Sequence, residues 1–369
     1  MVSISLPESQ SIAKVTIIDN GARISGRLSF FMEPVPEYII DEVLKAPAYV
    51  FFVENESSGR RVVFDLGIRK DPENLSPPVL AYHKDFSIQG GEDISEFLQH
   101  RDIDLKSIEA VIWSHHHLDH TGNPAGFPAA TDLVVGPSFK ETILPGYPKD
   151  PKGQILETDY EGRNIRQLDF GTESNGLVIG GFRAIDYFGD GSFYLLEVPG
   201  HTVDHIAGLA RTSVSPSRFI LEKMGADTGH HVSQWRPTRY LPLPKELTPS
   251  PLGVDHRFNL RTNVCPGHVF IDHVHPDHSD NTPFTQIKAG HSYDVESSRK
   301  SLEQMQLFDA DENIIVIMAH DYTMLPVMEF WPQTANDWHK ANWKESGRWL
   351  FLNYFNQVLE KALARTTSQ

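Results

Sequence analysis

A dense run of histidine and aspartate at residues 115–120 has the residue types and spacing best suited to chemistry. Its H-x-H-x-D-H pattern is formed by His115, His117, Asp119 and His120. The run directly follows the apolar residues 110–113, and such sheets place their sites in loops at the carboxyl ends of buried strands. Alternation in an extended turn points the first two histidines to one side, whereas the last two residues face a second position. Because neutral imidazole and carboxylate suit Zn²⁺, and also Fe or Mn, the run predicts two neighbouring metal positions.

Three more candidate ligands come later in the chain, each at the end of a predicted buried strand. They are His201, Asp227 and His320. Gly200 frees the backbone for a sharp turn that presents the first of them. The chain has one cysteine, Cys265, so no disulfide within the chain and no thiolate zinc knuckle can form. Any metal site must therefore use histidine and carboxylate.

Short strands are the elements expected to position these residues. They are predicted at residues 14–19, 48–53, 61–65, 110–113, 132–135, 182–187, 193–197, 206–210, 219–222 and 314–318. Residues 54–59 predict a hairpin turn between the second and third of these strands. No linker separates the early strands from the late ones, which favours two α/β halves packed on each other rather than two independent domains.

Helices are fewer and are recognised by the spacing of their apolar residues. Residues 92–100 predict a short amphipathic helix. Asp294 predicts the N-cap of a helix through residue 308 that buries Val295, Leu302, Met305 and Phe308. Residues 348–363 predict a second, strongly apolar helix.

Composition limits the partners of this protein. The chain has 369 residues and a net charge of −16, with 33 Lys and Arg against 49 Asp and Glu. This charge repels phosphate backbones, and there is no run of basic residues, so no nucleic-acid partner is expected. The longest apolar runs, residues 48–53 and 314–319, are far too short to span a membrane. The amino terminus has no charged n-region and no apolar h-region, so we expect a cytoplasmic protein with no membrane partner.

With these motifs, the chain resembles the metallo-β-lactamase fold superfamily. The resemblance implies that His115, His117 and His201 hold one metal ion. It implies that Asp119, His120 and His320 hold a second ion, with Asp227 bridging the two. It also implies that Asp65, in the sequence Phe-Asp-Leu-Gly, orients the site without binding the metal. The implied cofactors are two Zn²⁺ ions, with Fe or Mn as alternatives.

The same resemblance implies the architecture. We expect an α+β fold, a four-layer αββα sandwich, in a single domain that covers residues 1–369. Asp227 and His320 are 93 positions apart, which implies an insertion at about residues 228–311. A C-terminal helical extension is expected at about residues 333–369. The oligomeric state stays open, with a homodimer as one alternative.

The motif set is similar to the lactonase and glyoxalase-II branches, and the general pattern resembles fungal lactonase-type and lactamase-type members. This implies a dinuclear hydrolase that opens a small lactone or lactam (a cyclic ester, amide or carbamate) by attack of a metal-bound hydroxide. Asp119 would relay a proton to the leaving group. His230 stands where bacterial lactonases often carry a substrate-binding tyrosine, so it is a second candidate catalytic residue.

Two other functions remain open on the same ligands. One is a thioesterase like glyoxalase II, against which the charge of −16 argues mildly, because that branch usually carries basic residues for an acidic thiol carrier. The other is a mononuclear iron dioxygenase. A second histidine-dense stretch, His268 to His278, is either a third metal site or lid, or a polar loop inside the insertion.

Overall fold

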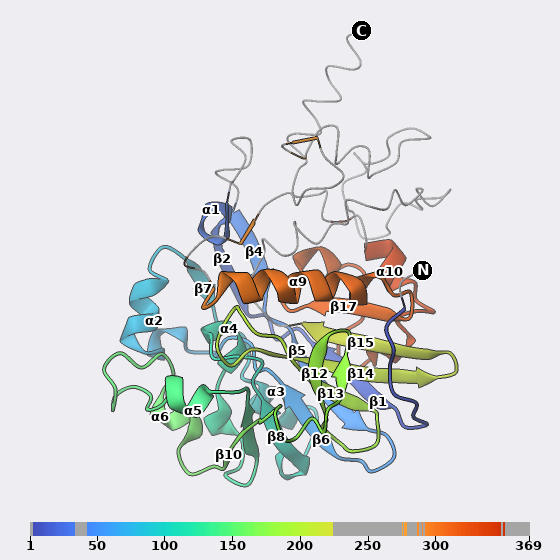
Figure 1. The fold of residues 1–369 in the computed structure, drawn as a ribbon. Helices are drawn as coiled ribbons and strands as arrows, with labels where there is room; N and C mark the ends of the chain where they lie inside the picture. Colours follow the sequence, from blue (N-terminus) through green and yellow to red (C-terminus); the bar gives the residue numbers. More distant parts are fainter. Residues whose placement is uncertain are drawn as a thin grey trace.

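The computed structural model describes residues 3–33, 43–223 and 292–347, together with residues 275, 277, 278, 286, 287, 290 and 350. Two six-stranded sheets form its centre (Figure 1). The first sheet has the strand order β1-β5-β6-β8-β9-β10. Its strands are β1 (Ala13–Ile18), β5 (Val50–Asn55), β6 (Arg61–Phe64), β8 (Ile108–Ile112), β9 (Asp132–Val135) and β10 (Ile165–Gln167).

The second sheet has the order β11-β12-β13-β14-β15-β17. Its strands are β11 (Val178–Ile179), β12 (Phe182–Asp186), β13 (Phe193–Glu197), β14 (Ile206–Val214), β15 (Ser217–Lys223) and β17 (Ile314–Met318). The strands from β11 to β15 are antiparallel neighbours, and β17 adds to β15 in parallel. This parallel pairing places the end of β17, Met318, beside Lys223 of β15, which lies 95 positions earlier in the chain.

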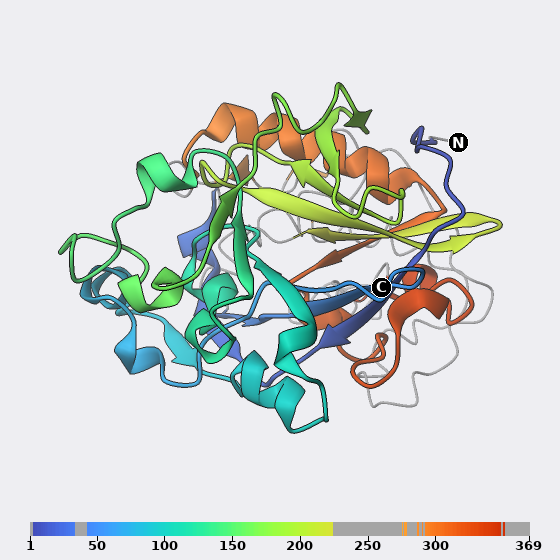
Figure 2. The same ribbon diagram turned by 90° about the horizontal axis from the view of Figure 1, so that it is seen from below.

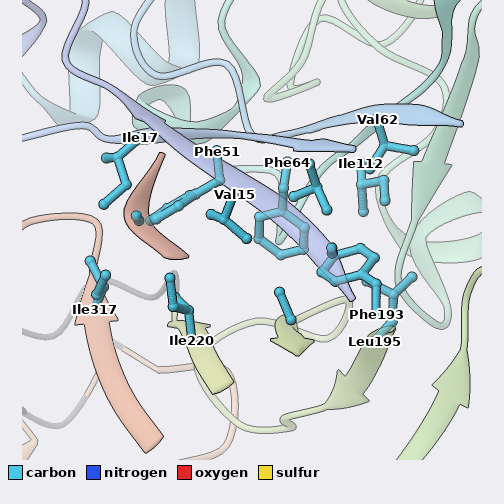
Figure 3. Packing of buried hydrophobic residues seen from close by; sticks show 14 of the residues in the cluster. Val15, Ile17, Phe51, Val62, Phe64, Ile112, Phe193, Leu195, Ile220 and Ile317 are labelled. Atoms are coloured by element: carbon cyan, nitrogen blue, oxygen red, sulfur yellow. The ribbon is translucent and has the colours of Figure 1, made fainter. Parts of the chain in front are cut away.

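The main hydrophobic core lies between the two sheets (Figure 3). Alternate residues of each strand point into it, as expected where one face of a sheet is buried against another. Phe51, Phe64 and Ile112 enter from the first sheet, and Leu195 and Ile317 enter from the second. Residues 322–347 cover one side of this core with buried side chains that include Trp338 and Trp343.

Helices cover the outer faces. The outer face of the first sheet packs on α3 (Ile94–Gln99) and α5 (Phe139–Thr142), and that of the second sheet packs on α9 (Val295–Ala310). Figure 2 shows α9, in orange, lying along the second sheet on the side away from the first. The predicted four-layer αββα sandwich is therefore confirmed.

Shorter elements surround the sandwich. The other α-helices are α1 (Leu28–Phe31), α2 (Pro77–Tyr82), α4 (Leu118–Thr121), α6 (Glu157–Tyr160) and α10 (Trp343–Gly347). The 3₁₀ helices are η2 (Pro72–Asn74), η3 (Leu105–Ser107), η4 (Pro124–Gly126), η7 (Tyr322–Met324) and η8 (Ala335–Asp337). A three-stranded sheet that was not predicted contains β4 (Val43–Pro47), β2 (Arg23–Arg27) and β7 (Ser87–Gln89), and β3 (Met32–Glu33) pairs with β16 (Gln286–Ile287).

The predicted elements agree with the structure to within a few residues. The strand predicted at residues 314–318 is β17, with the same bounds, and the turn at residues 54–59 joins antiparallel β5 and β6. Asp294 is the N-cap of α9 and accepts hydrogen bonds from the backbone N–H groups of Glu296 and Ser297. One detail was wrong: Val295 is half-buried rather than buried, because it lies in the first turn, at the rim of the contact with the sheet.

The predicted domain boundaries stay predictions. Within the range of the predicted insertion, α9 packs on the second sheet, and most of residues 228–291 lies outside the described residues. Within the range of the predicted extension, η8 and α10 are described, whereas the helix predicted at residues 348–363 lies outside the described residues. In the described part of the chain, no helix is both long enough and apolar enough to cross a membrane.

Candidate metal centre

Three histidines form a first cluster, which we call position 1. The Nε2 atom of His115 lies 3.0 Å from Nδ1 of His117, and Nε2 of His201 lies 3.1 Å from that same Nδ1. One ring nitrogen from each histidine thus converges on a common point, and the potential ligand atoms all lie within 4.8 Å of one another. Three converging imidazoles are a usual protein contribution to a zinc site.

Asp119, His120 and His320 form a second cluster, which we call position 2. The Nε2 atoms of the two histidines lie 3.1 Å apart. The carboxylate of Asp119 approaches both, with Oδ2 at 3.4 Å from Nε2 of His320 and Oδ1 at 3.8 Å from Nε2 of His120. All three residues are buried. Position 2 therefore differs from position 1 in having a negative charge.

Both positions take candidate ligands from both sheets. Strand β8 ends at Ile112, and the turn after it, together with α4, carries the four motif residues 115, 117, 119 and 120. His201 lies in the loop between β13 and β14, and His320 follows β17. The backbone N–H of Ile206, at the start of β14, donates to the carbonyl of Ser114 at 2.9 Å. The packing of the two sheets thus sets the distances between ligands that are far apart in sequence.

Asp65 connects the two positions. It follows β6 with φ of 58°, a left-handed conformation that aspartate tolerates better than most residues, and it is fully buried. Its Oδ2 accepts from Nδ1 of His120 at 2.6 Å and from the hydroxyl of Ser114 at 2.8 Å. Since that hydroxyl proton is directed to Asp65, Ser114 Oγ accepts from Nδ1 of His115 at 3.0 Å. One carboxylate thus orients an imidazole in each cluster, the role expected for Asp65 from the sequence.

These outer hydrogen bonds fix the tautomers of the inner imidazoles. A carboxylate accepts from Nδ1 of His120, and the carbonyl of Pro47 accepts from Nδ1 of His320 at 2.7 Å. Both neutral rings would then present a lone pair on Nε2, and the two lone pairs would face each other across 3.1 Å. This arrangement requires a positive charge at position 2, either a proton or a metal cation. The donor set therefore fits a divalent cation.

The pKa values of the cluster residues agree with this chemistry. Burial and the neighbouring imidazoles lower the pKa of His115 well below its usual value and that of His117 to about 3. Burial alone would raise the pKa of Asp119, but the nearby imidazoles, led by that of His120, hold it at about 2. The ligands of position 1 named here are therefore neutral, and Asp119 is ionised, as metal binding requires.

His120 behaves differently from the other histidines. Burial lowers its pKa, but the carboxylates of Asp119 and Asp65 outweigh burial and raise the pKa above the usual value of 6.5. Burial lowers the pKa of its neighbour His320. A proton bound between the two Nε2 atoms would therefore reside on His120 rather than on His320, and a metal ion at position 2 would have to displace it.

Several predicted residues lie outside the described residues. These are Asp227, His230, Cys265, His268 and His273. Of this stretch the structure describes His275, Asp277 and His278, so the function of the stretch from 268 to 278 stays open. Among the residues that the structure describes, positions 1 and 2 are the two groups with a metal-binding arrangement.

The sequence analysis missed three buried polar residues beside the clusters: His116, Asp204 and His205. The ring of His205 lies 5.2 Å from that of His115, and its Nδ1 donates to the carbonyl of Val198 at 2.8 Å. His116 contacts Asp204, as described below. The available signal was the sequence Pro-Gly-His-Thr-Val-Asp-His at residues 199–205, in which two ionisable residues, Asp204 and His205, follow His201 within four positions.

Comparisons with known proteins agree with this geometry. Gamma-lactamase FDB1 of Fusarium pseudograminearum is 39% identical over 98% of this chain and 86% of its own length. Metallo-hydrolase mfmC of Annulohypoxylon moriforme is 36% identical over 97% of this chain and 91% of its own length. The prediction of a metal-dependent hydrolase of the lactonase or lactamase type agrees with these names.

The fold has counterparts among solved structures. An N-acyl homoserine lactone hydrolase, with the product N-hexanoyl-L-homoserine at its catalytic metal centre, aligns with a TM-score of 0.55. The alignment covers 88% of this chain and 99% of that protein at 14% identity, so it supports the fold alone. Residues 45–210, which carry six of the seven strand-end residues 65, 115, 117, 119, 120, 201 and 320, match the profile of the Metallo-beta-lactamase superfamily. Together with the identity to the gamma-lactamase, this match shows that the chain belongs to the metallo-β-lactamase superfamily.

Proposed function

We propose that this protein is a dinuclear metal-dependent hydrolase that opens a small lactone or lactam. The observation that carries the proposal is the pair of imidazole nitrogens at position 2, which face each other at 3.1 Å while their outer nitrogens are bound by Asp65 and Pro47. A second converging cluster, position 1, lies directly beside it on the same turn. Two clusters sharing one turn support a two-metal site over a mononuclear one.

In this proposal, His115, His117 and His201 hold one ion, Asp119, His120 and His320 hold the other, and Asp227 bridges them. Imidazole and carboxylate ligands suit Zn²⁺, and they also accommodate Fe or Mn. Two divalent cations held by these residues would supply Lewis acidity and would lower the pKa of a coordinated water to about 7. Such a site opens an activated carbonyl without a nucleophilic side chain, and the sequence contains no G-x-S-x-G motif.

The protein's own side chains orient the candidate metal-binding nitrogens and limit the access of water. The hydrogen bonds of Asp65 and Ser114 fix the tautomers of His120 and His115, so the binding nitrogens are aimed before a ligand arrives. Position 2 is buried, and at position 1 His115 and His201 are buried while His117 is partly exposed, so bulk water has limited access to both clusters. Asp119, whose carboxylate the structure places at position 2, takes the role of carrying a proton at Oδ to the leaving heteroatom. His230 takes the role of hydrogen-bonding the substrate carbonyl oxygen.

The substrate class rests on the relatives. Curated relatives are named gamma-lactamase and metallo-hydrolase, and the aligned structure is named an N-acyl homoserine lactone hydrolase. These names support a small cyclic amide or ester as substrate, without a nucleic-acid or membrane partner. We place this activity in the cytoplasm, which cell fractionation with an antibody against the protein tests directly.

A substrate panel tests the function. Metal-free protein is prepared with a chelator, reloaded with Zn²⁺, and incubated with γ-lactams, γ-lactones, a cyclic carbamate and S-lactoylglutathione, with ring opening followed by mass spectrometry. We expect opening of a lactone or lactam that returns in proportion to added Zn²⁺. Hydrolysis of the thioester alone would support the glyoxalase-II-like alternative. Oxygen consumption that requires iron would support the dioxygenase alternative.

A further inference from the structure

We infer that His116, the middle histidine of the run, positions His201 for metal binding at position 1 through a hydrogen bond to Asp204. His116 is not one of the proposed ligands, and the bond joins two loops that are 88 residues apart in sequence. One loop carries His115 and His117, and the other carries His201. The inference rests on the proposed metal centre, because it concerns the distance between ligands of that centre.

The contact between the two side chains is short and almost completely buried. Nδ1 of His116 lies 2.8 Å from Oδ1 of Asp204, and the side chains are 7% and 1% exposed. Burial raises the pKa of Asp204, but the interaction with His116 outweighs burial and leaves the pKa below its usual value. The carboxylate is therefore ionised and can only accept, so Nδ1 of His116 donates. A buried charge is stable only with such a partner, which makes this bond costly to remove.

The backbone of Asp204 is rigidly held, so it can serve as an anchor. A Cβ atom added to Gly136, just after β9, would lie 1.9 Å from the carbonyl oxygen of Asp204, which shows how closely the two backbones approach. The next residue, His205, accepts a hydrogen bond from the backbone N–H of Val198 at 3.1 Å and closes the loop on itself. The position of Asp204 is thus fixed against the first sheet and within its own loop.

The opposite flank of the His201 loop packs on α9. The backbone N–H of Asp294 donates to the carbonyl of Gly200 at 2.9 Å, and that of Tyr293 donates to the carbonyl of His201 at 3.0 Å. Gly200 has φ of 127°, and a Cβ atom there would lie 2.2 Å from the backbone nitrogen of Ser298. The loop is therefore held by α9 on one flank and by the His116–Asp204 bond on the other.

The bond to His116 links the loop directly to the turn that carries the other two residues of position 1. His116 lies between His115 and His117 in sequence, and its ring is 5.1 Å from that of His117. Nε2 of His201 must stay about 3 Å from Nδ1 of His117 for three nitrogens to share one ion (the distance here is 3.1 Å). Loss of residues that support metal ligands typically lowers metal affinity by about 10–100-fold.

A double-mutant cycle on metal affinity tests the inference. The variants are His116→Ala, Asp204→Ala and the pair, and Zn²⁺ affinity is measured on metal-free protein by competition with a chromophoric chelator. We expect each single variant to weaken one of two zinc equivalents by about 10–100-fold. The double variant should lose no more than either single variant, because both remove the same bond. His116→Asn, which retains a donor near the place of Nδ1, should recover most of the lost affinity.

Two controls separate positioning from general destabilisation. His100→Ala removes a histidine whose Nδ1 lies 2.6 Å from Oε1 of Glu92 in an exposed pair, and it should leave both zinc equivalents unchanged. Ile185→Ala truncates a side chain of the core between the sheets, and it should lower Tm without weakening one equivalent more than the other.

The outcomes distinguish this inference from the proposed function. One outcome is that wild-type protein and His116→Ala both bind two zinc equivalents with the same affinity. This result would contradict the inference and leave the proposed metal centre intact. Equal weakening of both equivalents, in proportion to a lower Tm, would contradict it as well. Wild-type protein that takes up no zinc would contradict both the proposed function and the inference.

Discussion

The two candidate metal positions share one turn but are held in different ways. At position 2 the outer nitrogens of His120 and His320 are bound by Asp65 and by the carbonyl of Pro47, and Tyr49 adds a hydrogen bond to the carbonyl of Asp321 at 2.9 Å. These contacts come from strand ends and backbone groups. At position 1 the placement of His201 depends on a loop held by α9 and by the His116–Asp204 bond.

Charge also separates the two positions. Position 2 includes the carboxylate of Asp119 and the imidazole of His120, whose pKa is raised. At position 1 the pKa values of His115 and His117 are lowered. We therefore expect a metal ion at position 2 to compete with a proton, and a metal ion at position 1 to depend on loop geometry. By this comparison, metal affinity at two neighbouring positions would depend on pH at position 2 and on loop geometry at position 1.

Removal of a ligand should have the largest effect and should separate the positions most sharply. In His117→Ala, position 1 loses the nitrogen that lies near both other imidazoles. We expect Zn²⁺ affinity at position 1 to fall by more than about 100-fold, beyond the usual cost of losing a supporting residue. Activity should fall with it, while position 2 keeps its ion. Unchanged metal stoichiometry by plasma emission spectroscopy would remove His117 from the assignment.

His230→Ala should reduce turnover and leave both positions loaded. Loss of one donor to a developing oxyanion typically costs about 10²–10³-fold in kcat. We expect a loss of that size at saturating lactone or lactam, with two zinc equivalents retained. The neighbouring His231→Ala is the matched control and should keep its activity. A His230→Ala enzyme with wild-type kcat would exclude this residue from the mechanism.

Asp65→Ala should act on both positions together. The change removes the carboxylate that accepts from His120 and from the hydroxyl of Ser114. Without it Ser114 no longer has a fixed hydroxyl orientation, so the orientation of His115 is lost as well. We expect affinity to fall by about 10–100-fold at each position. Asp65→Asn keeps the size and the left-handed preference but weakens the acceptor, so it should fall between Ala and wild type. A loss confined to one position, measured by chelator competition, would contradict the role of Asp65 as a link.

The pH dependence of metal binding should be the smallest effect that still separates the positions. Below the raised pKa of His120, its protonated form predominates and each bound ion at position 2 must release that proton. Affinity at position 2 should therefore fall by up to about tenfold per pH unit as pH drops below that pKa. Since the pKa of His117 is about 3, affinity at position 1 should change little between pH 5 and 8 through this residue. Equal pH dependence at both positions, by calorimetric titration, would contradict the comparison.

The strand ends that carry most of the candidate ligands were predictable from the sequence because a strand end is a local signal. An apolar run such as residues 314–318, followed by His-Asp, marks both the strand and the residue that leaves it. The role of Asp65 came from the resemblance. The small sheet of β2, β4 and β7 could not be predicted, because β2 reads Arg-Ile-Ser-Gly-Arg and has a glycine that accommodates the ring of Phe86. The His116–Asp204 bond could not be predicted either, since it depends on how two sheets stack.

Anomalous diffraction from crystals of the zinc-loaded protein tests the central claim most directly, because it locates each ion without reference to a substrate. The account predicts two zinc peaks. One should lie among the converging nitrogens of His115, His117 and His201, and the other among Asp119, His120 and His320. A single peak, or two peaks bound by other residues, would contradict the two-position centre.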